Sequence, residues 1–145
     1  MDKKSSLALV AALQLLMERP RVAEQRARVR GVAEGEAVDA AVRVNRVTTE
    51  WTIEDEQSRP RVGRGGIFPY EAALLMPSQL PIWGRFEDAY SPILAEQTHS
   101  GFRIVSRHKE IPDAVCGITL RRADQVAISF FTPDYSLSLV DPLDS

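Results

Sequence analysis

The sequence predicts an α+β domain in which N-terminal helices pack on a largely antiparallel sheet of about four to five strands that ends in a β-meander. Two observations favour this class. An apolar, helix-like stretch opens the chain at residues 5–17, and residues 102–145 contain four extended segments separated by turn signals. The length of 145 residues fits a single domain over 1–145. Within it we expect a helical arm at 1–31 and an α+β body at 37–145.

The first helix is expected to begin at Ser5 or Ser6, either of which can cap it, and to continue to Met17. Pro20 then ends it, because proline lacks a backbone donor and clashes with the preceding turn. The stretch is apolar on nearly every side. Such a helix is buried either within its own domain or against another chain.

Residues 19–30 carry five arginines and one glutamate, a local charge of +4. Their spacing is compatible with two structures. Val22 and Val29 align on a helix, whereas Arg26, Arg28 and Arg30 alternate with small apolar residues as in a strand. Pro20 at a first helical position favours the helix.

A half-buried strand is predicted at Val47–Glu54, where apolar or threonine side chains alternate with polar ones. Val42 and Val44 fall on the opposite parity. A bulge near Asn45 and Arg46 would bring both sets to one face.

The segment 55–66 has no periodic apolar pattern and holds three glycines, so we expect a long exposed loop. The prolines that follow permit only short helices. One is expected at Tyr70–Met76, and a second at Pro92–Gln97 with Ser91 as its cap.

Four strands are predicted at the C-terminal end, with side-chain parity that indicates an antiparallel meander with one wet face. They are Phe102–His108, Val115–Arg121, Val126–Thr132 and Tyr135–Val140. The last is expected to be an edge strand, open to pairing with another chain.

No catalytic residue, cofactor or metal is predicted. The single cysteine, Cys116, excludes an internal disulfide, and its parity places it in the core. With His99 and His108 it lacks the closely spaced ligand pairs of a structural zinc site. The loop Gly63–Gly66 fails the phosphate-loop pattern, because no Gly-Lys-Ser/Thr follows.

The net charge of -2 argues against a general polyanion binder and against nucleic acid as a partner. Acidic and basic residues nevertheless fall in separate blocks, which can meet across an interface between chains. The N-terminal apolar run is too short to span a membrane and is followed by Glu18, without a cleavage site. We therefore expect a cytoplasmic location, or one within an intracellularly assembled particle.

The function predicted from these features is a non-catalytic assembly subunit that packs against other protein chains. The setting is a homo-oligomer or a hetero-assembly such as a virus particle. The expected interface combines the first helix, the basic segments and the last strand: Leu7, Leu9, Val10, Leu13, Leu16, Met17, Arg26, Arg28, Arg30, Arg61, Arg64, Tyr135, Leu137 and Leu139.

Two alternatives remain open. The first is a small-ligand-binding protein or small enzyme of α+β type, with an aromatic pocket formed by Trp51, Trp83, Phe86, Tyr90 and Phe102. The second is a binder of nucleic acid or another anionic partner through Arg19–Arg30 and Arg59–Arg64. Neither basic segment contains interleaved aromatic residues, which weighs against nucleic acid.

Overall fold

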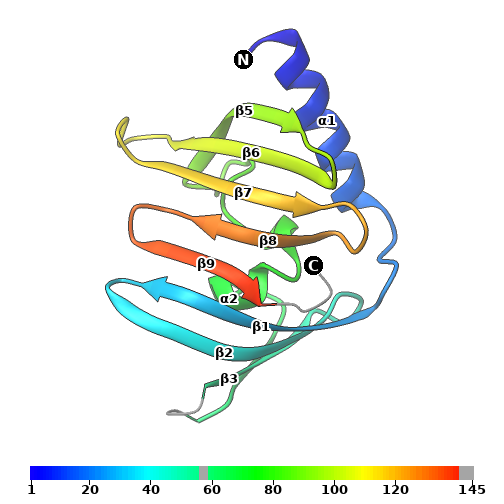
Figure 1. Cartoon of the computed structure of the whole chain (residues 1–145), viewed down its shortest axis with the longest axis vertical. Helices are drawn as coiled ribbons and strands as arrows, with labels where there is room; N and C mark the ends of the chain where they lie inside the picture. Colours follow the sequence, from blue (N-terminus) through cyan, green and yellow to red (C-terminus); the bar gives the residue numbers. More distant parts are fainter. Residues whose placement is uncertain (56–58, 141–145) are drawn as a thin grey trace.

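One nine-stranded antiparallel sheet dominates the computed structural model, which describes residues 1–55 and 59–140. Hydrogen-bonded neighbours follow the order β4-β3-β2-β1-β9-β8-β7-β6-β5 (Figure 1). The strands are β1 (Glu24–Ala33), β2 (Glu36–Asn45), β3 (Glu50–Asp55), β4 (Arg61–Arg64), β5 (Tyr90–Gln97), β6 (Gly101–His108), β7 (Val115–Arg121), β8 (Val126–Phe131) and β9 (Tyr135–Val140).

The sheet consists of two meanders, β1–β4 and β5–β9, that meet where β1 pairs with β9. In this seam Val29 lies opposite Leu139, and Arg30 lies opposite Ser138. Directly opposed residues share a face of the sheet. The seam therefore sets which side chains of the two meanders are buried together.

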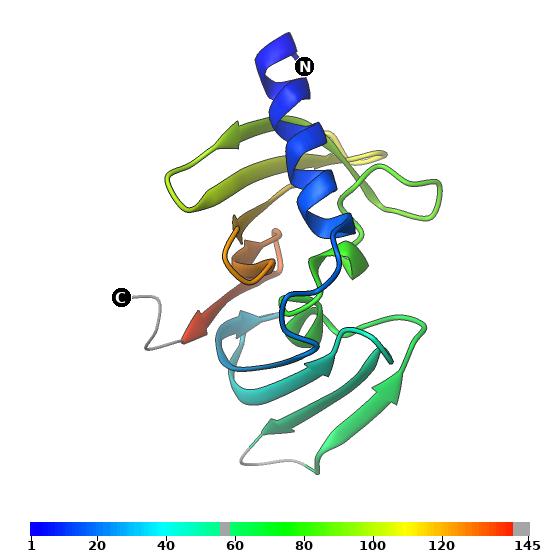
Figure 2. The ribbon, with the colours of Figure 1, turned by 90° about the vertical axis from the view of Figure 1, so that its right-hand side faces the viewer.

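Three helical segments lie on one side of the sheet: α1 (Lys3–Met17), α2 (Tyr70–Ala73) and the 3-10 turn η1 (Pro77–Gln79). Figure 2 shows the sheet curving around α1 and α2. We call this the helix-covered face and the opposite side the open face. The segment that contains α2 and η1 carries fully buried Leu74, Leu75, Leu80 and Ile82, so it fills the concave side of the sheet.

Helix α1 covers an edge of the sheet. Asp2 is its N-cap and accepts a hydrogen bond from the backbone N–H of Ser5 at 2.7 Å, which moves the start of the helix ahead of the predicted caps Ser5 and Ser6. The Ser5 hydroxyl accepts a hydrogen bond from the backbone N–H of Ala95 in β5 at 3.4 Å. An otherwise unpaired donor of the edge strand is thereby satisfied.

The predicted fold class is wrong, because the protein has one long helix and a sheet about twice as large as expected. The largest difference is in the arm, where the sequence is compatible with both structures over Arg19–Arg30 and favours a helix. Residues 24–33 instead form β1, which pairs with β2 on one side and β9 on the other. Two neighbouring strands satisfy its backbone, which outweighs a local preference for helix.

Pro92 also misled the helix prediction, since Pro92–Gln97 belongs to strand β5. This is an edge strand, and its register shifts between Pro92 and Leu94. Proline is tolerated at such edges and irregularities, because its missing N–H removes no ladder bond. Part of the predicted loop 55–66 likewise forms β4, while residues 56–58 of that loop lie outside the described residues.

Near Asn45 and Arg46 the chain makes a turn and not a bulge. The Asn45 carboxamide oxygen accepts the backbone N–H groups of Val47 and Thr48, each at 3.0 Å. The apolar residues before and after this turn fall on opposite parities because they belong to two antiparallel strands, β2 and β3. The four C-terminal strands β6–β9 do occur where the alternation predicts them, but β9 is central and not an edge.

Candidate functional site

A hollow of about 650 Å³ lies on the helix-covered side, where β4, two loops and β9 converge. We call it the mouth pocket. Its volume falls within the range of small-molecule sites. It is lined by Arg61, Gly66, Ile67, Phe68, Pro69, Tyr70, Glu71, Gln79, Pro81, Arg85, Glu87, Asp88 and Tyr135.

Aromatic rings form one wall of the mouth pocket. Pro69 leads into α2, so Tyr70 lies in the first turn of this helix. The Tyr70 ring packs edge-to-face with the ring of Tyr135 in β9, with ring centroids 4.7 Å apart. It packs in the same way with the ring of Phe130 in β8, with ring centroids 5.1 Å apart. Such edge-to-face contacts hold rings in fixed orientations. The pocket therefore has a rigid apolar wall anchored to the sheet.

An ion pair between Arg61 of β4 and the buried carboxylate of Glu71 closes the β4 side of the mouth pocket. Glu71 in α2 is only 9% exposed, and its Oε2 lies 2.6 Å from Nη2 of Arg61. Half of the Arg61 side chain remains exposed. A guanidinium has five N–H donors, so Arg61 can neutralise Glu71 and still donate to a molecule in the pocket.

The loop at 83–88 forms the opposite rim around a second buried carboxylate. Asp88 is 4% exposed and accepts hydrogen bonds from the backbone N–H groups of Trp83 and Arg85 and from Nε of Arg85. Arg85 also donates from Nη2 to the carbonyl oxygen of Leu80 at 3.0 Å. These bonds hold Arg85 at the pocket with nearly half of its side chain exposed.

The polar groups of this site are two arginines, Arg61 and Arg85, three carboxylates, Glu71, Glu87 and Asp88, the Gln79 amide and two phenols. Burial raises the pKa of Tyr70, and burial together with the hydrogen bond to Glu34 raises that of Tyr135, so both phenols are protonated at neutral pH. Among the described lining residues none is a serine, cysteine or histidine. The lining thus combines aromatic surface with charged groups that can orient a bound molecule.

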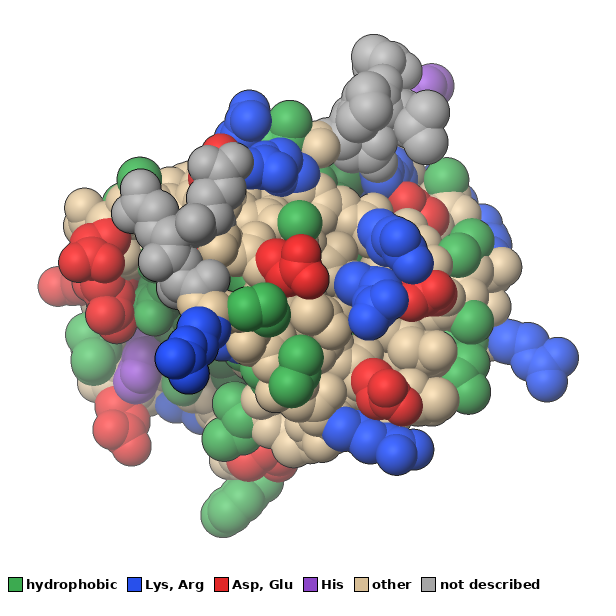
Figure 3. Space-filling model, turned by 90° about the horizontal axis from the view of Figure 1, so that it is seen from below, with side chains coloured by type: hydrophobic (Ala, Val, Ile, Leu, Met, Phe, Trp, Pro, Cys, Tyr) green, Lys and Arg blue, Asp and Glu red, His purple; other side chains and the backbone are tan. Residues whose placement is uncertain are grey.

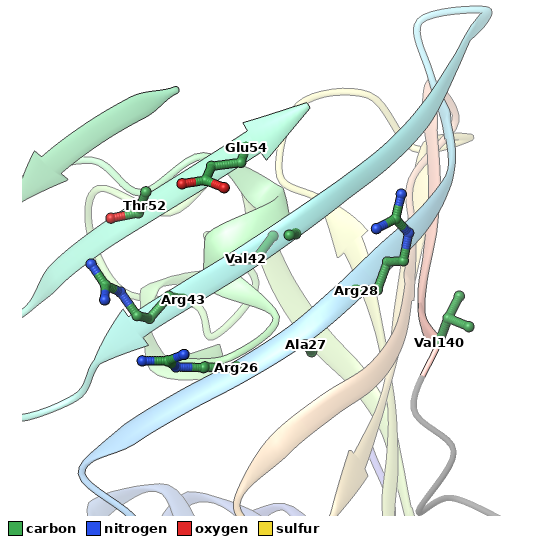
Figure 4. Close-up of a pocket in the computed structure, with 9 residues that line it drawn as sticks. Arg26, Ala27, Arg28, Val42, Arg43, Thr52, Glu54 and Val140 are labelled. Carbon is green, nitrogen blue, oxygen red and sulfur yellow. The ribbon is translucent and has the colours of Figure 1, made fainter. Parts of the chain in front are cut away.

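A second hollow, of about 440 Å³, lies on the open face over β1, β2 and β3. Figure 4 shows Arg26, Arg28 and Arg43 around it, with Thr52 and Glu54 on β3. Arg26 lies directly opposite Arg43, a repulsive arrangement that Glu24 relieves by approaching both guanidinium groups, at 3.8 and 3.4 Å.

Ion pairs continue along this face. Asp39 lies 2.6 Å from Nε of Arg28 and 3.3 Å from Nε of Arg30, and hydrogen bonding to Arg28 lowers its pKa. Figure 3 shows basic and acidic side chains intermixed at the β3 end of the molecule, with hydrophobic ones scattered among them. Exposed pairs of this kind are typical of a solvated sheet face.

The residues predicted for an interface do not form one surface. On α1, Leu7, Val10 and Met17 are exposed, whereas Leu9, Leu13 and Leu16 are half-buried. Arg26, Arg28 and Arg30 lie on the open face, as does Arg64, while Arg61 lies in the mouth pocket.

The last strand departs most clearly from the predicted interface. Tyr135 lines the mouth pocket, and Leu137 and Leu139 are buried in the core of their own chain. They lie on the helix-covered face, where Leu139 is opposite the buried Val29 and Leu137 is opposite Phe130, whose ring contacts Tyr70 of α2.

The predicted aromatic pocket does not form either. Tyr90 and Phe102 are buried, Phe86 is fully exposed, and none of the five predicted aromatic residues lines the mouth pocket. The aromatic residues that do line it are Phe68, Tyr70 and Tyr135. The sequence signal that points to this site is the pair of arginines Arg61 and Arg85, whose acidic partners Glu71 and Asp88 follow ten and three residues later.

Cys116 and His108 do not form a catalytic pair. Cys116 is fully buried, and burial raises its pKa to about 12, which disfavours the reactive thiolate. The His108 ring packs against Tyr90, and its Nδ1 accepts the backbone N–H groups of Glu110 and Ile111. In the described part of the chain no group of three potential ligands is arranged to hold a metal ion.

No protein-family model and no curated protein sequence matches this chain. No helix in the described part of the chain combines the length and hydrophobicity needed to cross a membrane. The function must therefore be argued from the site itself.

Proposed function

We propose that the protein binds a small molecule in the mouth pocket, and that the ligand combines an apolar body with a hydrogen-bond acceptor such as a carboxylate. The observation that carries this proposal is the pairing of an aromatic wall, Tyr70 and Tyr135, with two half-exposed guanidinium groups, Arg61 and Arg85, around one hollow. Pockets for small molecules commonly have this composition, largely apolar with a few convergent polar groups.

The charges of the pocket select the polar part of the ligand. Glu71 and Asp88 are each paired with an arginine through one carboxylate oxygen, Oε2 of Glu71 and Oδ2 of Asp88. Each guanidinium has five N–H donors, more than its hydrogen bonds to Glu71, Asp88 and Leu80 use, and it has no acceptor. A ligand acceptor satisfies these donors. An amine must instead compete with the arginines for Glu71 and Asp88 or pair with Glu87, whose side chain is 72% exposed, so that water screens the pair. We therefore expect acidic ligands to bind more tightly than amines of the same size.

Filling the pocket tests this function. Gln79 is half-buried and lines the hollow, so Gln79→Phe is expected to occupy the space with an aromatic ring. The probe is 1-anilinonaphthalene-8-sulfonate, which joins aromatic rings to an anionic acceptor. We expect Gln79→Phe to weaken its binding, followed by fluorescence titration, at least about tenfold, which corresponds to 1.4 kcal/mol.

Ser138→Phe is the matched control, because Ser138 is exposed on the open face of β9. It adds a ring of the same size outside the pocket and should leave the affinity unchanged. Equal affinity of all three proteins would place the probe elsewhere and contradict the proposed site. Thermal unfolding of each variant reports whether the fold is retained.

Assembly with other chains is a second proposal, supported by α1. Leu7, Val10 and Met17 recur at helical spacing and are all more than half exposed. An apolar stripe of this kind is typical of a contact surface. Light scattering over a range of concentrations tests it. The homo-oligomer is expected to dissociate when Leu7 and Val10 are both replaced by serine, and a wild-type monomer at every concentration contradicts it.

A further inference from the structure

Two large apolar side chains at the rims of the mouth pocket are almost entirely in water. Ile67 is 94% exposed, and Phe86 is fully exposed. Single exposed apolar residues are common on protein surfaces and need no explanation. Here, however, one residue stands in each of the two loops that border the same hollow. Ile67 lines the pocket directly, and Phe86 lies between the lining residues Arg85 and Glu87.

The two loops project on the same side of the molecule. In Figure 2 both extend to the right, away from the curved sheet, one following β4 and the other preceding β5. Each contains glycine with positive φ, Gly65 and Gly66 in the first loop and Gly84 in the second. Such positions let a short loop turn sharply and present its next residues outward.

The interactions within each loop fix its base and leave its tip unsupported. In the second loop, Asp88 and Leu80 hold Arg85 from two directions, while no contact buries the neighbouring Phe86 ring. In the first, Phe68 is 4% exposed and anchors the chain immediately after Ile67. Each apolar tip is therefore held beside the pocket by an anchored neighbour.

We propose that Ile67 and Phe86 form an apolar clamp over the mouth pocket, and that the ligand is a single-chain amphiphile with an acidic head group. The head group accepts hydrogen bonds from Arg61 and Arg85, and the alkyl chain lies along Tyr70 and is covered by the two loop tips. This inference rests on the proposed function and names its ligand class. Burial of each tip adds to affinity, because apolar surface leaves water only when the chain is bound.

A chain-length series tests the clamp. Calorimetric titration with octanoate, decanoate and dodecanoate below their micelle concentrations should show affinity rising about tenfold for each two methylenes added. Ile67→Ser and Phe86→Ser should each weaken dodecanoate binding about tenfold and octanoate binding much less. Dodecylamine should bind more weakly than dodecanoate to the wild type, since it offers no acceptor to the arginines.

The variants are chosen to leave the fold intact, because neither side chain is packed in the free protein. Ile111→Ser is the matched control, since Ile111 is also exposed but lies in the turn between β6 and β7. It should bind the whole series like the wild type.

The outcomes separate the clamp from the pocket. If Gln79→Phe abolishes probe binding but Ile67→Ser and Phe86→Ser retain the full chain-length dependence, the clamp is wrong and the pocket stands. If the naphthalene sulfonate binds in the pocket but no alkanoate does, the amphiphile is wrong. If the wild type binds neither the sulfonate nor the alkanoates, the proposed function fails together with the clamp.

Discussion

Gly31→Ala is expected to unfold the protein or to reduce its free energy of unfolding by roughly 4 kcal/mol or more. Gly31 lies in β1 opposite Leu137 of β9. A Cβ atom at this position would lie 1.8 Å from the carbonyl oxygen of Ser136 and 3.0 Å from Cα of Leu137. Both are backbone atoms, so no side chain can move aside, and the two strands must separate locally.

The seam makes this separation unusually costly. The pairing of β1 with β9 is the ladder that joins the two meanders of the sheet. Val29 and Leu139 face each other two positions from Gly31 and are buried in the shared core. Displacing the strands exposes this pair as well as breaking backbone hydrogen bonds, and a domain of this size has only about 5–15 kcal/mol of total stability.

Urea unfolding followed by far-ultraviolet circular dichroism measures the effect. Val32→Ile is the matched control, because it also adds one carbon to β1, at the next residue, where the side chain is 46% exposed. We expect the control to lie within about 0.5 kcal/mol of wild type. Equal stability of Gly31→Ala and wild type would show that the seam is not packed as described.

The sequence predicts strands β6–β9 of the second meander well and the first meander poorly, for a physical reason. In β6–β9 each strand has its own alternation and a clear turn after it, so local information suffices. Residues 24–33 of β1 have an arginine-rich pattern that suits helix and strand equally. The segment becomes a strand because it pairs with β9, which lies more than one hundred positions later in the chain. Arg30, for example, pairs with Ser138. No local pattern contains that information.

The mouth pocket could not be predicted for the same reason. Arg61, Tyr70, Arg85 and Tyr135 come from four separate segments, and only the curvature of the sheet brings them together. The predicted cluster of aromatic residues was chosen by residue type alone. Its members divide between core and surface because strand parity and loop position, and not aromatic character, decide where each side chain lies.

Arg46→Leu is expected to cost about 3 kcal/mol of stability, although Arg46 forms none of the ion pairs found among the described residues. This side chain is 7% exposed and follows β2 in the turn to β3. Its Nε and Nη2 donate to the carbonyl oxygen of Val22, at 3.1 and 2.8 Å, and its Nη1 donates to that of Asp124 at 2.6 Å.

These bonds connect three parts of the chain: the approach to β1, the end of β2 and the turn between β7 and β8. Burial lowers the pKa of Arg46, and the nearby charge of Asp124 raises it, but a guanidinium stays protonated under all ordinary conditions. Leucine fills similar space without donors. The carbonyl oxygens of Val22 and Asp124 would then lose their partner in a site largely closed to water, which is the costly case for a hydrogen bond.

Arg43→Leu is the matched control, because Arg43 is exposed on the open face three residues earlier and, among the residues that the structure describes, forms an ion pair with Glu24. Its loss should cost less than about 1 kcal/mol, as expected for an exposed ion pair. If the positive charge of an arginine at this end of the sheet stabilised the fold, Arg46→Leu and Arg43→Leu would lower the free energy of unfolding equally. A large loss in Arg46→Leu alone, partly recovered in Arg46→Lys, identifies donation to buried carbonyl groups as the stabilising interaction, because lysine restores a donor but not the geometry of the guanidinium.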